Sequence, residues 1–351
     1  MNKKLLTAAI GAALAAAPMF AANAAPTVYG KMNVGVASID NGNDSTATQD
    51  SSSLVMTDDA SRLGVKGEED LGGGMKALYL WETTIDVDNG GLLGGRDAYV
   101  GLGGGWGSLR LGQYNTAYKL VSVPTEIFGD TIGDFTGSNK AGETRQANNI
   151  GYTSPSFGGL KVALEYANHN ETGQTDTGAS PEITRMNGSV TWSSGPIYVG
   201  VGYYDFGPVS GANALDTAMQ VSAQWKSGPL RIAATYEDQK GQGNTTVFDN
   251  LNLAGSFAMG NHEFALSYTM VSCDASGTAT CTNADATMMA LGYFYNFSKS
   301  TALKVVYATI DNDANSAQMG RMSSGAASHS LPATAAGKDP SGLQVQISTS
   351  F

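Results

Sequence analysis

Acidic side chains in segment 114–145 are the first feature of this sequence that could act on other molecules. Glu126, Asp130 and Asp134 follow at four-residue intervals with apolar residues between them. Carboxylates gathered at one place bias the passage of ions and orient dipolar solutes. The apolar residues of the segment indicate that it packs against another surface rather than extending into solvent; they are Phe128, Ile132 and Phe135.

The two cysteines form a second candidate for chemistry. Cys273 and Cys281 are eight residues apart, with no other cysteine in the chain. In an oxidising compartment such a pair is expected to form a disulfide, with free thiols as the alternative.

Motifs for catalysis or metal binding are missing from the sequence. It has no Gly-x-Ser-x-Gly, P-loop or His-Glu-x-x-His motif, and Asp86–Gly90 lacks the remaining ligands of a calcium loop. The three histidines are too scattered to form one site; they are His169, His262 and His329. We therefore expect no catalytic residues, cofactor or metal, and a protein that is not an enzyme.

Composition narrows the class of protein. Only 15% of the 351 residues are charged, against about 25% in ordinary domains. The net charge of −11 leaves no basic footprint for nucleic acid. Beyond residue 22 no apolar run approaches the ~18 residues of a membrane-spanning helix.

The N-terminus has the features of a secretory signal peptide. Lys3 and Lys4 precede the apolar stretch 5–17, and Ala22-Asn23-Ala24 provides the small residues of a cleavage site. We expect cleavage after residue 24, which lowers the net charge of the remainder from −11 to −13 because two lysines are lost. A buried N-terminal helix is the alternative.

The rest of the chain repeats stretches of about ten residues in which apolar and polar residues alternate. In segment 219–226 every odd position is apolar and every even one polar, which places one face in an apolar environment and the other in water. Sixteen such strands are predicted, at 27–38, 61–69, 75–86, 95–103, 105–113, 146–154, 159–168, 184–193, 196–206, 217–226, 229–238, 248–258, 262–271, 286–297, 301–310 and 342–351.

The connections alternate between long and short. Those after odd-numbered strands are long and polar, as in 114–145 and 311–341, whereas those after even-numbered strands are tight turns. This alternation predicts an all-β protein, a transmembrane antiparallel β-barrel with short periplasmic turns and long external loops. A soluble β-sandwich or β-helix would also alternate, but it has no reason to separate its loops by length. We expect one barrel domain over 25–351.

Sixteen strands make a barrel wide enough for an aqueous channel. The third long loop, 114–145, carries the apolar residues described above and is therefore expected to fold inward against the wall. Its carboxylates would then face the bore and constrict it.

Five ordered stretches resemble the general diffusion porins of Gram-negative bacteria. They are Tyr29–Lys31, Ser61–Gly74, Arg96–Leu102, Pro124–Asp130 and Asn149–Pro155. The resemblance implies a homotrimer in the outer membrane, each barrel passing small hydrophilic solutes and ions by passive diffusion. Contacts with outer-membrane lipid, lipopolysaccharide and the outer-membrane assembly machinery are implied as well.

The same resemblance implies a charged constriction. Lys31, Arg62 and Arg96 would form a basic ladder on the wall, opposite Glu126 and Asp130 on the loop. Alternation supports the first two positions and adds Arg110, while Asp134 belongs to the acidic segment. Each of these charges could instead be an ordinary solvated residue of the lumen.

Some positions depart from the family pattern. Thr153 stands where the family commonly has an arginine, and Arg145 could replace that arginine. Asp97 falls on the predicted lipid-facing side of its strand, so we expect it near an interface or in a trimer contact, since a carboxylate in hydrocarbon is costly. With one basic position in doubt and an acidic chain, we expect a weak preference for cations.

The last residue, Phe351, resembles the signal read by the outer-membrane assembly machinery, or it fills an aromatic girdle at the membrane interface. Other functions remain open. A substrate-specific channel for sugars or organic acids would need aromatic residues along the bore, where Tyr198 and Tyr204 are candidates. A barrel hydrolase and a surface adhesin are further alternatives.

Overall fold

The computed structural model describes residues 25–42, 52–87, 90–137, 140–142, 144–169, 183–208, 215–275, 280–316 and 336–351. The predicted signal peptide and His329 lie outside these ranges. The strands are β1 (Thr27–Asp40), β2 (Ser52–Asp58), β3 (Arg62–Gly72), β4 (Met75–Asp86), β5 (Gly91–Gly104), β6 (Gly107–Asn115), β7 (Arg145–Thr153), β8 (Leu160–His169), β9 (Ile183–Ser194), β10 (Ile197–Asp205), β11 (Leu215–Ser227), β12 (Leu230–Gly241), β13 (Thr246–Met259), β14 (His262–Ala275), β15 (Ala286–Asn296), β16 (Thr301–Asn312) and β17 (Ser341–Ser350).

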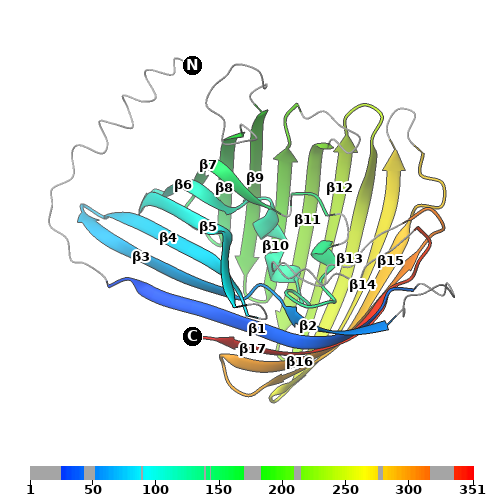
Figure 1. Ribbon diagram of the computed structural model, residues 1–351. Helices are drawn as coiled ribbons and strands as arrows, with labels where there is room; N and C mark the ends of the chain where they lie inside the picture. Colours follow the sequence, from blue (N-terminus) through cyan, green and yellow to red (C-terminus); the bar gives the residue numbers. More distant parts are fainter. Residues whose placement is uncertain are drawn as a thin grey trace.

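The strands form one closed antiparallel sheet. Consecutive strands pair along the chain, except that β2 and β3 both pair with β1, and β17 pairs with β1 from Lys31 opposite Ser350 to Asp40 opposite Ser341. Figure 1 shows the red β17 lying along the blue β1. The predicted β-barrel is therefore confirmed.

The second strand of the barrel is broken into two segments. Both β2 and β3 pair with β1, β2 along 34–40 and β3 along 27–31. Between them lie Asp59, Ala60 and Ser61, and Ala60 has a φ of 60°. Seventeen segments thus make sixteen barrel strands. The first segment was predicted as loop, although Leu54 and Met56 alternate with Val55 and Thr57.

The connections follow the predicted alternation of long loops and short turns, with two exceptions. Five of the short turns have only two residues, at 73–74, 105–106, 195–196, 228–229 and 260–261. On the opposite side the connections 87–90 and 242–245 have only four residues, shorter than expected. The reason is that β5, β12 and β13 extend beyond their predicted ends, so residues predicted as loop continue the barrel wall.

Alternation along the strands separates an apolar outer face from a polar inner face. On β14, Phe264, Leu266 and Tyr268 are exposed, while Ser267 and Thr269 are buried. An outer band of uncharged side chains is what contact with lipid requires. Within the described ranges, no helix is long and apolar enough to cross a membrane.

Candidate channel constriction

The connection between β6 and β7, residues 116–144, lies inside the barrel and is called the third loop below (Figure 1). It contains three short 3₁₀ turns, η1 (Lys119–Val121), η2 (Val123–Thr125) and η3 (Phe135–Gly137). Phe128 and Ile132 are 3% and 0% exposed, packed in one cluster with inward-facing residues of β15 and β16. The predicted inward fold of the loop is confirmed.

A glycine on the wall makes room for this packing. A methyl group at Gly292 would lie 2.7 Å from Cε1 of Phe128 and 2.9 Å from Cζ of Phe294. The two phenylalanine rings meet edge to face with centroids 5.9 Å apart. Only a residue without a side chain lets the ring of Phe128 sit against the strand at this position.

Polar anchors hold both ends of the loop. The Tyr118 hydroxyl donates to Oε2 of Glu237 at 2.7 Å, and the backbone N–H of Ala141 donates to Oε1 of the same carboxylate at 2.7 Å. The hydroxyls of Thr125 and Thr235 are 2.7 Å apart. Sequence reasoning missed Glu237 because its partners lie about a hundred residues away, although its alternation on β12 places it in the lumen.

Further anchors bind backbone oxygens of the loop. Nη2 of Arg231 donates to the carbonyl of Pro124 at 2.6 Å, and the Tyr198 hydroxyl donates to the carbonyl of Val121 at 2.8 Å. Nδ2 of Asn33 donates to the carbonyl of Asp130 at 3.1 Å. The loop is therefore attached to several separate strands, which fixes the position of its acidic tip.

Asp130 joins this tip to the basic side of the wall. Its Oδ2 lies 2.9 Å from Nζ of Lys31 and 3.9 Å from Nη1 of Arg62. Burial alone would raise the pKa of Asp130, but Lys31, Arg62 and Lys304 outweigh it, and the pKa is lowered from its usual range. Asp130 is therefore ionised at neutral pH and keeps an electrostatic bridge from loop to wall.

A second acid on the wall completes the basic ladder. Glu82 on β4 forms an ion pair with Arg96 and another with Arg62 at 3.7 Å, and it accepts a hydrogen bond from the Tyr29 hydroxyl at 2.9 Å. Sequence reasoning missed Glu82. Alternation next to the outward-facing Trp81 was the signal that could have found it.

The expectation that Asp97 faces lipid is wrong. Its Oδ1 accepts a hydrogen bond from Nε of Arg145 at 2.6 Å, inside the barrel. Val100 is 63% exposed and points outward, so alternation turns Asp97 inward. The register of β4 and β5 shifts between Trp81, opposite Ala98, and residue 83, opposite 95, so β5 has one extra residue, a β-bulge. Because of this bulge the neighbouring Arg96 also points inward.

These charges surround one cavity of about 590 Å³. The residues lining it carry five basic and five acidic side chains among the described ranges. They are Lys31, Arg62, Arg96, Lys119 and Arg145, with Glu82, Asp97, Glu126, Asp130 and Asp134. Six of the seven predicted constriction residues therefore meet at this cavity.

The seventh, Arg110, lies elsewhere. Its guanidinium carbon stands 4.4 Å from the ring centroid of Tyr114 and 5.4 Å from that of Tyr99. It lines a separate cavity of about 180 Å³ between the wall and residues Leu120 and Pro124 of the third loop. Arg110 thus faces the lumen without bordering the constriction cavity.

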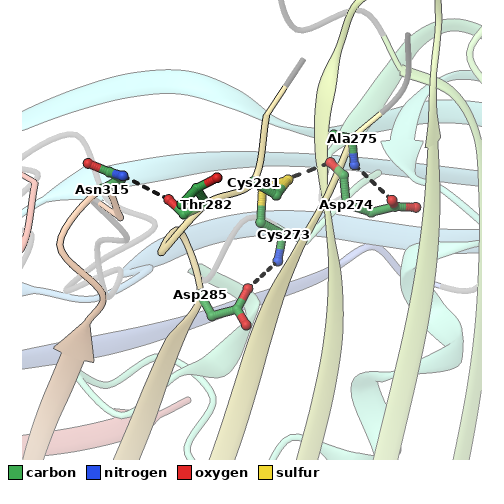
Figure 2. The surroundings of a disulfide bond; sticks show 7 residues. All are labelled: Cys273, Asp274, Ala275, Cys281, Thr282, Asp285 and Asn315. Atoms are coloured by element: carbon green, nitrogen blue, oxygen red, sulfur yellow. Dashed lines mark hydrogen bonds between the residues drawn. A yellow bond between two sulfur atoms is a disulfide. The ribbon is translucent and has the colours of Figure 1, made fainter. Parts of the chain in front are cut away.

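The two cysteines join the end of β14 to the connection between β14 and β15. Cys273 and Cys281 form a disulfide with their Cα atoms 5.4 Å apart. Figure 2 shows the backbone N–H of Cys273 donating to Asp285 at 2.7 Å, while the Asn315 amide donates to the carbonyl of Thr282 at 2.7 Å. The connection between β14 and β15 thus contacts the segment that follows β16, and the disulfide lies next to this contact.

Among the residues that the structure describes, no group of three or more His, Cys, Asp or Glu side chains could hold a metal ion. Seven of the charged side chains of the cavity instead form ion pairs with each other; they are Lys31, Arg62, Arg96, Arg145, Glu82, Asp97 and Asp130.

A closed sixteen-stranded barrel with a charged loop folded inside is the architecture of an outer-membrane β-barrel protein. The model of the Gram-negative porin family matches residues 7–315, and the chain belongs to that family. As a member with this barrel it is a multi-pass protein of the outer membrane.

Individual relatives agree with this membership. The chain is 34% identical over 173 residues to the major outer membrane protein P.IB of Neisseria meningitidis, covering 47% of this chain and 50% of the relative. It is also 34% identical over 219 residues to the outer membrane porin protein 32 of Delftia acidovorans, covering 58% and 59%. The chain thus spans about half the length of the curated relatives it matches.

Solved structures match over more of the chain. The anion-selective porin from Comamonas acidovorans has a TM-score of 0.75 and 25% identity, covering 93% of this chain and 99% of that one. OmpT of Vibrio cholerae in its trimer form has a TM-score of 0.67 at 16% identity, with 93% and 99% covered, and shows the shared fold.

Proposed function

We propose that this protein forms a water-filled channel through which small hydrophilic solutes and ions cross the outer membrane by passive diffusion. The observation that carries the proposal is the charged cavity of about 590 Å³ between the wall and the third loop. A solute that crosses the barrel at this height passes between the two charged surfaces. We propose a channel and not an enzyme.

The constriction acts through crossed charges. Lys31, Arg62 and Arg96 project from the wall, and Glu126, Asp130 and Asp134 project from the loop; all border the cavity. Opposed charges across a narrow opening create a transverse field that orients dipolar solutes and acts on ions. Segment 114–145 is therefore proposed as the constriction loop.

Selectivity of this constriction is proposed to be weak. The overall charge of the chain favours cations, but the cavity has equal numbers of basic and acidic residues. Local charges act on a permeating ion more strongly than distant ones, which salt screens. One structural neighbour is described as anion-selective, which also speaks against a strong cation preference here.

A general channel is favoured over a substrate-specific one by the two lumenal tyrosines. The Tyr198 hydroxyl binds the carbonyl of Val121, and the Tyr204 hydroxyl donates to Gln146 at 2.9 Å. Tyr204 also meets Tyr118 edge to face. Both rings support the third loop, and neither borders the constriction cavity of about 590 Å³, so they do not form an aromatic path for sugars through the constriction.

Assembly follows the family. We propose a homotrimer in contact with outer-membrane lipid and lipopolysaccharide, made from a precursor whose residues 1–24 are a signal peptide and whose residues 25–351 form the barrel domain. One structural neighbour is recorded in a trimer form. Phe351 is proposed as the signal for the assembly machinery, since it is exposed at the end of the closing strand β17.

Recording from the purified protein in planar bilayers tests the channel. Ohmic current, conductance steps in groups of three and a reversal potential near zero in a salt gradient are expected. Absence of conductance from a folded protein would contradict the channel. Saturation of the current by one sugar at low concentration would favour the substrate-specific alternative.

A further inference from the structure

A second cavity lies at the end of the barrel where the short turns are. Its volume is about 600 Å³, and it is bordered by residues of the turns 154–159 and 195–196. Lys161 and Lys226 line it, and no carboxylate does so among the described residues. This purely basic lining contrasts with the balanced charges of the constriction and with the net charge of −11 for the whole chain.

Both lysines point into the lumen by alternation. Lys161 lies on β8 between the outward-facing Leu160 and Val162, and Lys226 on β11 follows the outward-facing Trp225. Both side chains are exposed, and neither has a hydrogen-bond or ion-pair partner within the described ranges. Their charges are therefore available to a solute in the cavity.

A third basic residue stands directly across from one of them. Lys226 pairs with Arg231 in the register of β11 and β12. Like charges directly opposite each other destabilise a sheet, and an anion between them would relieve that repulsion. Arg231 already has partners, because the carboxylates of Glu263 and Glu126 attract its charge and its guanidinium donates a hydrogen bond to the carbonyl of Pro124. Lys226 is therefore the charge of the pair that is available to a solute.

The basic region continues towards the third loop. The cavity of about 180 Å³ that Arg110 lines also has Lys161, Thr191 and Tyr198 in its wall, so the two cavities adjoin. The larger cavity adds neutral hydrogen-bond donors suited to anionic oxygens, namely Ser156, Thr191, Ser193 and Gln224. Its volume is in the range of sites for small molecules, about 300–1,000 Å³.

We propose that Lys161 and Lys226 form a binding subsite for small organic anions that carry carboxylate or phosphate groups, on the short-turn side of the constriction. The subsite rests on the proposed channel function and deepens it. A basic wall concentrates anions locally, and because it lies at one end only, the channel responds differently to anions from its two sides.

Single-channel recording of the whole protein tests the subsite. The ionic strength is kept at about 0.1 M, where charges act over about 10 Å. Citrate, as the carboxylate probe, or glycerol phosphate, as the phosphate probe, is added to one side at a time, with uncharged sucrose for comparison. Transient blockage by the anions from one side only is expected, and block by either probe alone assigns the chemical class.

The variants Lys161→Gln and Lys226→Gln, singly and together, identify the residues. Each substitution should weaken the binding of the blocking anion about fivefold, which is the effect of one unit charge at close range in water. Lys76→Gln is the matched control, because Lys76 lies at the same end of the barrel, pairs with Glu68 at 2.5 Å and does not line this cavity.

Two results would overturn the subsite while leaving the channel in place. They are conductance without any one-sided anion effect, and equal blockage in the double variant and the wild type. Absence of conductance in folded wild-type protein would overturn the channel function and the subsite with it.

Discussion

Nζ of Lys31 lies 2.9 Å from Oδ2 of Asp130, although 99 residues separate them. This ion pair connects the first strand of the barrel to the tip of the third loop. The Asp130 side chain remains 29% exposed, so the pair is in contact with the water of the cavity. Its charges therefore contribute both to holding the loop and to the field that a solute meets.

Removal of the loop carboxylates should change ion selectivity. In Glu126→Gln/Asp130→Asn two negative charges leave the cavity while the wall keeps its basic residues. The reversal potential in a salt gradient should shift towards anions, and conductance should rise as the loop loses its bond to Lys31. Asp238→Asn is the control, because Asp238 pairs with Lys240 at 2.8 Å and does not border this cavity. Unchanged selectivity would remove these two residues from the constriction.

The contribution of Asp130 should depend on pH in a defined direction. Its pKa is lowered in the folded protein, so the ion pair is fully present at and above the usual Asp pKa of about 3.9 and is lost only as the pH falls further. The reversal potentials of wild type and Asp130→Asn should differ at every pH down to about 3.9 and converge below it. Convergence already near pH 6 would contradict a lowered pKa.

Gly292 should tolerate no side chain. In Gly292→Ala the new methyl group would lie 2.7 Å from Phe128 and displace its ring. Overpacking of this kind costs about 1–3 kcal/mol, so the folded barrel should unfold at a lower temperature and the conductance should change with the loop position. Gly255→Ala provides the comparison, since its nearest neighbour is an ordinary 3.5 Å away. Equal effects of the two substitutions would argue against the packing described here.

The disulfide should stabilise the connection between β14 and β15 and leave the barrel intact. Removing it in Cys273→Ser/Cys281→Ser should cost about 2–3 kcal/mol on the loop-closure relation. Proteolysis of this connection should become faster, while conductance should stay the same, since neither cysteine borders the constriction cavity. Alkylation followed by mass measurement, with and without reductant, checks the bond itself. Full labelling without reductant would show free thiols.

Phe351 should matter for assembly more than a comparable aromatic residue. Its backbone exchanges two hydrogen bonds with Gly30, at 3.0 and 3.1 Å, and a methyl group at Gly30 would overlap its ring. Deletion of Phe351 should therefore lower the amount of assembled protein in the outer membrane without changing its synthesis. Phe297→Ala, at another exposed aromatic side chain, should have little effect. Equal losses would indicate that any aromatic residue of the outer surface is needed.

Local patterns were sufficient for much of the fold. Period-two alternation depends only on neighbouring residues, and it located the barrel strands within a few positions, except for β2, the first segment of the second strand, which was predicted as loop. Phe128 and Ile132 predicted that the third loop is buried, because apolar side chains in a loop are stable only when they pack against other apolar groups. The lumenal side of Lys31 followed from the same alternation.

Only the tertiary structure determined which residues pair with each other, and the bulge in β5 determined which way its charged side chains point. Asp97 was misplaced because alternation from an inward-facing Arg96 turns it outward, and the slip between β4 and β5, which lets both side chains face inward, is a property of two strands together. Glu82 and Glu237 each have a partner far away in the chain, and only the pairing of β1, β3 and β4 and the inward fold of the third loop bring those partners within hydrogen-bond distance. The sequence by itself thus determined, for most strand residues, which face water and which face lipid. The three-dimensional register of the strands determined which charges meet, because electrostatic pairing depends on distances that the chain order does not set.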